Sequence, residues 1–187
     1  MDAAITYEAN YLRAGLEQLK DYLLSKQLFW SSGLGSADNG RPYPQLTLGN
    51  LLFSKQVVET AGAEPELFNQ FDAIKQEWKS AWQSKAEREF EARLDPWREY
   101  IVYLKQYASA DSRDYETEIR VRALLELLIP EAPGLGENQL HTLEIEDQHL
   151  RRILDEGDFV WDAELKPAFP QSRFWYLYGK PNPKKNN

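Results

Sequence analysis

The feature that most constrains the fold is an apolar stripe between Glu66 and Tyr107. Large apolar residues recur there at steps of three, four or eight, the spacing of an α-helix that turns one face to a core. The stripe consists of Leu67, Phe71, Ile74, Trp78, Trp82, Phe90, Leu94, Trp97, Ile101 and Leu104. The residues between them from Lys75 to Arg93 are mostly charged and are expected to face water. The sequence therefore predicts a long amphipathic helical element against which the other segments pack.

Pro96 lies inside this stripe and leaves two interpretations open. Proline has no backbone donor, and it disfavours helical geometry at the preceding Asp95. Asp95 could cap a new helix that has Pro96 in its first turn. Alternatively, one helix of about 40 residues could continue with a kink at the proline. The stripe keeps its phase from Phe90 through Leu94 to Trp97, which favours two nearly collinear segments with a bend at Pro96.

The same periodicity predicts helices on both sides of the central element. They cover residues 3–25, 48–61, about 111 or 114 to 129, and 139–156. Thr47 is a suitable cap for the second helix, and Gly62 and Gly157 are expected to end the second and the last. Residues 143–146 also alternate between apolar and acidic, as a short strand would. Residues 31–44 and 130–138 are rich in Gly and Pro and are expected to be loops.

The C-terminal region from 158 to 179 is densely aromatic. Exposing so many rings to water would be costly, so this segment is expected to pack across the helices. Residues 181–187 contain Pro, Lys and Asn and are expected to be disordered. The predicted fold is all-α, an antiparallel bundle of about five or six helices in a single domain over residues 1–180.

Composition excludes several classes of function. The chain has no cysteine, which excludes disulfides, thiolate catalysis and Cys-based zinc or iron–sulfur sites. A net charge of −8 argues against nucleic acid and anionic lipid as partners. Residues 1–30 lack the basic start and apolar run of a signal peptide, and no apolar run approaches the ~20 residues that span a membrane. A cytoplasmic protein without membrane association is expected.

Two short motifs resemble known sites but lack required residues. Gly33-Leu34-Gly35 begins like a dinucleotide-binding loop, but Asp38 stands where the third glycine is needed and no strand precedes it. The chain also lacks the Gly-x-Ser-x-Gly pattern of a hydrolase nucleophile. Neither phosphate cradling nor nucleophilic hydrolysis is therefore predicted, and no cofactor is expected.

Glu146 and His149 form the most suggestive metal-binding motif. A Glu followed three residues later by His places both side chains on one helix face, as in di-iron carboxylate bundles. Such sites need two pairs of this kind, and the only other histidine, His141, precedes Glu144 in the reversed order. A di-iron site is therefore not expected, and the preferred interpretation of both histidines is a surface or half-buried position. A metal-dependent enzyme that uses Glu146 and His149 remains the third hypothesis.

The excess of aromatic residues is the strongest remaining signal. Small-molecule sites are largely apolar with a few polar groups, so some of these rings could line a pocket beneath the loop 31–44. The candidate ligand-binding residues are Trp30, Tyr43, Trp82, Trp161 and Trp175, with Trp78 and Trp97 as further members. The alternative is that the rings fill the core, which the helical spacing of Trp78, Trp82 and Trp97 favours.

Three functional hypotheses follow from the sequence. The leading one is a non-enzymatic helical protein that binds a protein partner or a second copy of itself, because the charged helix from Lys75 to Arg93 accompanies surplus aromatics. The second is a small-molecule binder with an aromatic pocket under the loop 31–44. The third is the metal-dependent enzyme.

Overall fold

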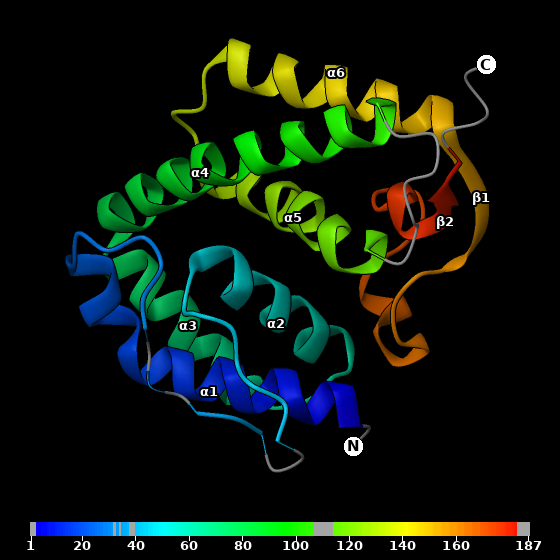
Figure 1. Cartoon of the computed structure of the whole chain (residues 1–187). Coiled ribbons are helices and arrows are strands. Elements are labelled where there is room, and N and C mark those ends of the chain that lie inside the picture. Colours follow the sequence, from blue (N-terminus) through cyan, green and yellow to red (C-terminus); the bar gives the residue numbers. More distant parts are fainter. Residues whose placement is uncertain (1–2, 32, 34, 38–39, 107–113, 183–187) are drawn as a thin grey trace.

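The chain is mostly helical, which confirms the predicted class. The computed structural model describes residues 3–31, 33, 35–37, 40–106 and 114–182. These residues form the helices α1 (Ala3–Leu24), α2 (Leu48–Thr60), α3 (Pro65–Glu77), α4 (Lys79–Gln106), α5 (Tyr115–Leu128) and α6 (Glu137–Ile153) (Figure 1). Short 3₁₀ segments are η1 (Ile129–Glu131), η2 (Ala163–Ala168) and η3 (Trp175–Leu177). No described helix combines the length and apolar character needed to cross a membrane.

The long central element is divided at Trp78 and not at Pro96. Trp78 leaves the helical region with φ −108° and ψ 31°, and Figure 1 shows α3 and α4 diverging from that point. Of the two interpretations left open at Pro96, a new helix that begins there is wrong, because α4 continues through Pro96. A proline inside a helix costs about 3 kcal/mol. Keeping the helical phase buries Leu94 and Trp97, and each such side chain contributes about 1.5–3 kcal/mol. Tyr107, the predicted end of the element, lies outside the described residues.

The apolar stripe does face the core, as predicted. Phe71, Trp82, Phe90, Trp97 and Ile101 are each at most 1% exposed. The helix whose first half is covered on all sides, however, is α2, which packs against α1, α4 and α5 and lies between α1 and α5 in Figure 1. Every residue from Leu48 to Ser54 is buried. The helix that the others cover is therefore shorter and earlier in the chain than the sequence suggested.

Two charged residues expected to face water are buried in the structure. Lys85 is 2% exposed and Glu89 is 0% exposed. The Lys85 ammonium donates to the carbonyl of Gln27 and to the hydroxyl of Ser25, both just after the end of α1. These two contacts supply a positive charge at the carbonyl end of a helix, where it is favourable. Lys85, a charged residue of α4, therefore binds the C-terminal end of α1 and does not face water.

Glu89 performs the opposite role at the start of α2. Its two carboxylate oxygens accept from the backbone N–H of Gly49 at 3.2 and 3.1 Å. Arg93, one turn further along α4, pairs with Glu89 at 2.7 Å. A carboxylate at a helix N-terminus satisfies free N–H groups and the helix dipole. Thr47 adds the predicted side-chain cap, accepting from the N–H of Asn50 at 3.2 Å.

A two-stranded sheet follows α6 and departs from the all-α prediction. Strands β1 (Leu154–Phe159) and β2 (Tyr178–Pro181) pair antiparallel. The strand register is irregular between Glu156 and Phe159, and Gly157 lies within this irregular part of β1. The prediction that Gly157 ends a helix is therefore wrong, because α6 ends at Ile153. Pro181 belongs to β2, and the N–H of Asn182 donates to the carbonyl of Ile153 at 2.6 Å. Of the predicted tail 181–187, residues 181 and 182 are therefore described, and residues 183–187 lie outside the described part.

The aromatic C-terminal region is buried as expected. Phe169, Phe174 and Tyr176 are each 0% exposed. The ring of Phe169 packs on that of Phe53 in α2, with 4.8 Å between centroids. The hydroxyl of Tyr115 in α5 donates to the carbonyl of Tyr176 at 2.6 Å. This region therefore closes one end of the space between α2 and α5.

Candidate functional site

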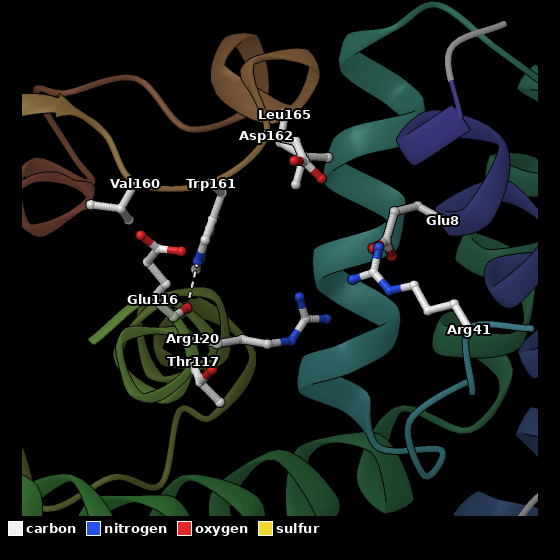
Figure 2. Close-up of a pocket in the computed structure, with 9 residues that line it drawn as sticks. All are labelled: Glu8, Arg41, Glu116, Thr117, Arg120, Val160, Trp161, Asp162 and Leu165. Atoms are coloured by element: carbon white, nitrogen blue, oxygen red, sulfur yellow. Dashed lines mark hydrogen bonds between the residues drawn. The ribbon is translucent and has the colours of Figure 1, made fainter. Parts of the chain in front are cut away.

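A pocket of about 480 Å³ opens between α1, Arg41 of the α1–α2 connection, α5 and the segment 160–165 (Figure 2). Most of its lining side chains are charged, and the rest include a short apolar wall. The charged members are Glu8, Arg41, Glu116, Arg120 and Asp162, and the apolar ones are Val160, Trp161 and Leu165. Small-molecule sites in proteins have volumes of about 300–1,000 Å³, so this pocket is large enough for a small organic molecule.

Glu8 of α1 is the most buried charged residue of the pocket, at 3% exposed. One carboxylate oxygen accepts from the hydroxyl of Ser54 in α2 at 2.5 Å. Burial raises the pKa of Glu8, while the positive charge of Arg120, the Ser54 hydrogen bond and Arg41 lower this pKa in part. The carboxylate is therefore held where its negative charge is only partly compensated by the protein.

Arg120 of α5 is half-buried and projects into the same pocket. Its guanidinium lies over the ring of Phe53, 3.9 Å from the centroid. Its one hydrogen bond to a described residue is long, 3.4 Å to the side-chain oxygen of Asn50, and it forms no ion pair with any described carboxylate. Burial lowers the pKa of Arg120, but a guanidinium stays charged at neutral pH. Most of its five N–H donors therefore remain available to a ligand.

Arg41 reaches the pocket from the connection between α1 and α2. Its guanidinium stacks over the ring of Tyr7 at 4.3 Å. The hydroxyl of Tyr7 donates to the carbonyl of Pro42 at 2.7 Å, and the ring of Tyr43 lies 4.9 Å from that of Tyr7. The hydroxyl of Tyr11 donates to the carbonyl of Gln45 at 3.0 Å. Tyrosines of α1 therefore fix this part of the loop and place Arg41 at the pocket.

The opposite wall is built on Trp161. The indole N–H donates to the backbone carbonyl of Glu116 at 2.8 Å, and the ring packs edge-on against Phe53 with centroids 5.6 Å apart. The carboxylate of Glu116 pairs with Lys180 of β2 at 2.9 Å. Hydrogen bonding and ring packing together make this wall rigid, and a rigid wall suits a binding site.

Of the aromatic residues predicted to form a pocket, only Trp161 lines this one. Trp30 donates to Gln18 and packs against Tyr22. Tyr43 lies on Tyr7. Trp82 is 1% exposed and donates to Glu131 at 2.8 Å. Trp175 lies beneath the guanidinium of Arg151 at 3.7 Å, beside a separate hollow of about 150 Å³. The structure therefore does not gather these rings around one cavity, although Arg41 of the predicted loop does reach the pocket.

The predicted metal ligands are not gathered into a site. Glu146 is 8% exposed, and its carboxylate pairs with the ammonium of Lys105 at 3.4 Å. His149 is half-buried, and burial together with Lys105 lowers its pKa. His141 lies 3.8 Å from Glu144 on an exposed face. Among the described residues, no three His, Asp or Glu side chains are placed to hold a metal ion.

Glu8 and Arg120 were not predicted as site residues from the sequence. The sequence does contain an indication of both, because each is a charged residue at a position where the helical periodicity predicts a buried apolar one. Glu8 stands four residues before Leu12, and Arg120 stands four residues before Leu124. The buried polar residues Asn50 and Ser54 of α2 are a second signal, because charged side chains are absent from Leu48 to Ser54 and both polar groups need partners.

Comparison with known proteins adds no residue roles. The chain matches no protein-family model, no curated protein and no solved structure.

Proposed function

We propose that this chain binds a small organic molecule whose carboxylate or phosphate pairs with Arg120. The observation that carries the proposal is that the guanidinium of Arg120 has few polar contacts with the described part of the protein. It faces a pocket and lies on an aromatic ring, but its contact with a described polar group is one hydrogen bond of 3.4 Å. A partly desolvated cation with unused donors favours an anion, and the planar guanidinium binds carboxylate or phosphate through two parallel bonds.

The surroundings of Arg120 support a ligand site over a purely structural role. Arg41 supplies a second positive charge to the same pocket. Val160, Trp161 and Leu165 offer an apolar wall, and most small-molecule sites combine apolar walls with a few polar groups. Glu8 comes from α1, Arg120 from α5 and Arg41 from a loop held by tyrosine hydrogen bonds, so the relative positions of these charges are set before a ligand arrives.

Thermal unfolding in the presence of carboxylates and phosphates tests the proposal. A ligand present at 100 times its Kd stabilises the native state by about 2.7 kcal/mol. Arg120→Met keeps an unbranched side chain over Phe53 but removes the charge, and it should abolish the ligand-induced shift. Arg98→Met is the matched control, because among the described residues Arg98 pairs with Asp95 alone, on the exposed side of α4, and it should keep the shift. A shift that survives Arg120→Met, or the failure of every compound to stabilise the wild type, would refute the proposal.

Binding to a protein partner is the second candidate function, and exposed apolar side chains favour it. Val102 and Tyr103 on α4 are 42% and 41% exposed, and Leu140 and Ile145 on α6 are 40% and 38% exposed. The two helices pack together. Light scattering tests self-association, and a pull-down tests other partners. A strict monomer that captures no partner would remove this candidate.

A further inference from the structure

We infer that the ligand of the Arg120 pocket is a free α-amino acid, whose carboxylate binds Arg120 and whose ammonium binds Glu8. This inference rests on the proposed function and specifies the chemical class of the ligand. It depends on the charge of the pocket lining, on the geometry of Glu8, and on the apolar wall.

The charge of the lining favours a zwitterion over a simple anion. Two arginines and three carboxylates face the pocket. Lys180 pairs with Glu116 through a contact of 2.9 Å, and the lining also holds the carboxylates of Glu8 and Asp162 beside Arg120. A ligand that carries only negative charge would be attracted to the arginines and repelled by both carboxylates. A zwitterion can place each of its charges beside an opposite one.

Glu8 is the group that needs a cationic partner. It is 3% exposed and lines the pocket, and the hydroxyl of Ser54 is its one hydrogen-bond donor among the described residues. Arg120 is close enough to influence the pKa of Glu8, yet the two do not pair within the 4.0 Å of an ion pair. A buried carboxylate is costly unless it is paired, so a donor in the gap between these two side chains would satisfy both.

An α-amino acid has its ammonium on the carbon that carries the carboxylate, so one small group can bridge the two opposite charges. Figure 2 shows Arg120 projecting into the pocket between Trp161 on one side and Glu8 on the other. With its charged groups at Arg120 and Glu8, the side chain of the amino acid would lie towards Trp161, Val160 and Leu165. These residues are apolar or aromatic, so the site favours an amino acid with an apolar or aromatic side chain.

The test compares each apolar and aromatic amino acid with the same acid lacking its amino group, for example L-phenylalanine with 3-phenylpropionate. Titration calorimetry on the wild type is expected to show at least tenfold tighter binding of the amino acid. Glu8→Gln keeps the size of the side chain and a partner for Ser54 but removes the charge. It should abolish the preference while retaining or tightening the binding of the deaminated acid, which the charge of Glu8 no longer repels, and Arg120→Met should abolish the binding of both compounds. A single cooperative thermal transition without ligand would verify that each variant is folded.

The possible failures are distinguishable. If deaminated acids bind as tightly as amino acids and still require Arg120, the amino-acid assignment is overturned and the anion pocket stands. A preference that persists in Glu8→Gln would overturn the role of Glu8 and, with it, the assignment. If neither class of compound binds the wild type, the proposed function and this inference both fail.

Discussion

Replacing Gly49 with alanine should destabilise this protein, although alanine is the better helix former. Gly49 lies in the first turn of α2, and its N–H donates to both carboxylate oxygens of Glu89. A Cβ at this position would stand 2.7 Å from one of those oxygens and 3.4 Å from the Cβ of Leu124. In an unobstructed helix, the same substitution would stabilise by about 0.5–1 kcal/mol.

The expected loss depends on how firmly Glu89 is held. A free glutamate would rotate away, but this carboxylate is 0% exposed and pairs at 2.7 Å with Arg93, whose side chain is 12% exposed. Moving the carboxylate weakens its hydrogen bond with the N–H of Gly49, and hydrogen bonds to charged groups contribute about 1.5–3 kcal/mol. After subtracting the helix-propensity gain, the net loss should be roughly 1–2 kcal/mol. For a chain of this length each kcal/mol lowers Tm by about 2–4 °C.

Urea and thermal unfolding of Gly49→Ala measure this loss. The matched control is the same substitution in a background that carries Glu89→Ala and Arg93→Ala, where both members of the ion pair are absent. There the added methyl group should be neutral or stabilising. Equal or greater stability of the single variant would show that Glu89 moves aside at no cost, and the proposed role of its carboxylate at α2 would then be wrong.

Three further predictions concern buried polar groups. Burial raises the pKa of Glu8 above its value in the unfolded chain. Between these two pKa values the native state binds more protons than the unfolded state, so the free energy of unfolding falls as pH rises through that range. Urea unfolding at a series of pH values should show this slope in the wild type and not in Glu8→Gln. Burial lowers the pKa of Lys85 from 10.5 to about 8, so stability should rise with pH between these values, and Lys85→Met should remove that rise in the same assay. The hydroxyl of Tyr176 is buried without a hydrogen-bond partner among the described residues, so Tyr176→Phe should leave Tm unchanged or raise it. Tyr115→Phe should lower Tm, because it loses a bond of 2.6 Å worth about 1 kcal/mol; equal effects of the two substitutions would contradict this comparison.

Local patterns were sufficient to locate most of the helices. The first two were predicted at 3–25 and 48–61, and α1 and α2 cover Ala3–Leu24 and Leu48–Thr60. Their periodicity and the Thr47 cap are properties of neighbouring residues, which a sequence displays directly. The stretch 143–146 carried two patterns, and it is helical in α6, where Leu143 and Glu146 are buried one turn apart.

The position of the central break depended on tertiary packing. Neither Gly nor Pro marks Trp78, whose ring lies half-buried beneath the ammonium of Lys20 in α1. At Pro96 the local signal for a boundary was strong, but burial of the stripe on either side of it maintained the helix. At both positions, contacts with other helices outweighed the conformational preferences of the neighbouring residues.

The candidate site could not be assembled from sequence for a related reason. Glu8, Ser54 and Arg120 are far apart in the chain and meet only because α2 lies between α1 and α5. The aromatic residues that seemed suited to a pocket became core or anchoring residues, with Trp161 as the exception. Charged residues at helix positions that the periodicity assigns to the core were the better indicator of the candidate site, because a buried charge needs a partner.

The burial of α2 determines how the protein can unfold. Its 13 residues contact helices that precede and follow it, and η2 near the other end of the chain. Leu51 lies beside Gly15 of α1, and Phe53 packs against Phe169 and beneath Arg120 of α5. Separation of α2 from these segments would expose side chains that are now 0% exposed. Amide protons of α2 should consequently exchange with solvent only when the whole molecule opens, while those of the β1–β2 ribbon should exchange through small local fluctuations.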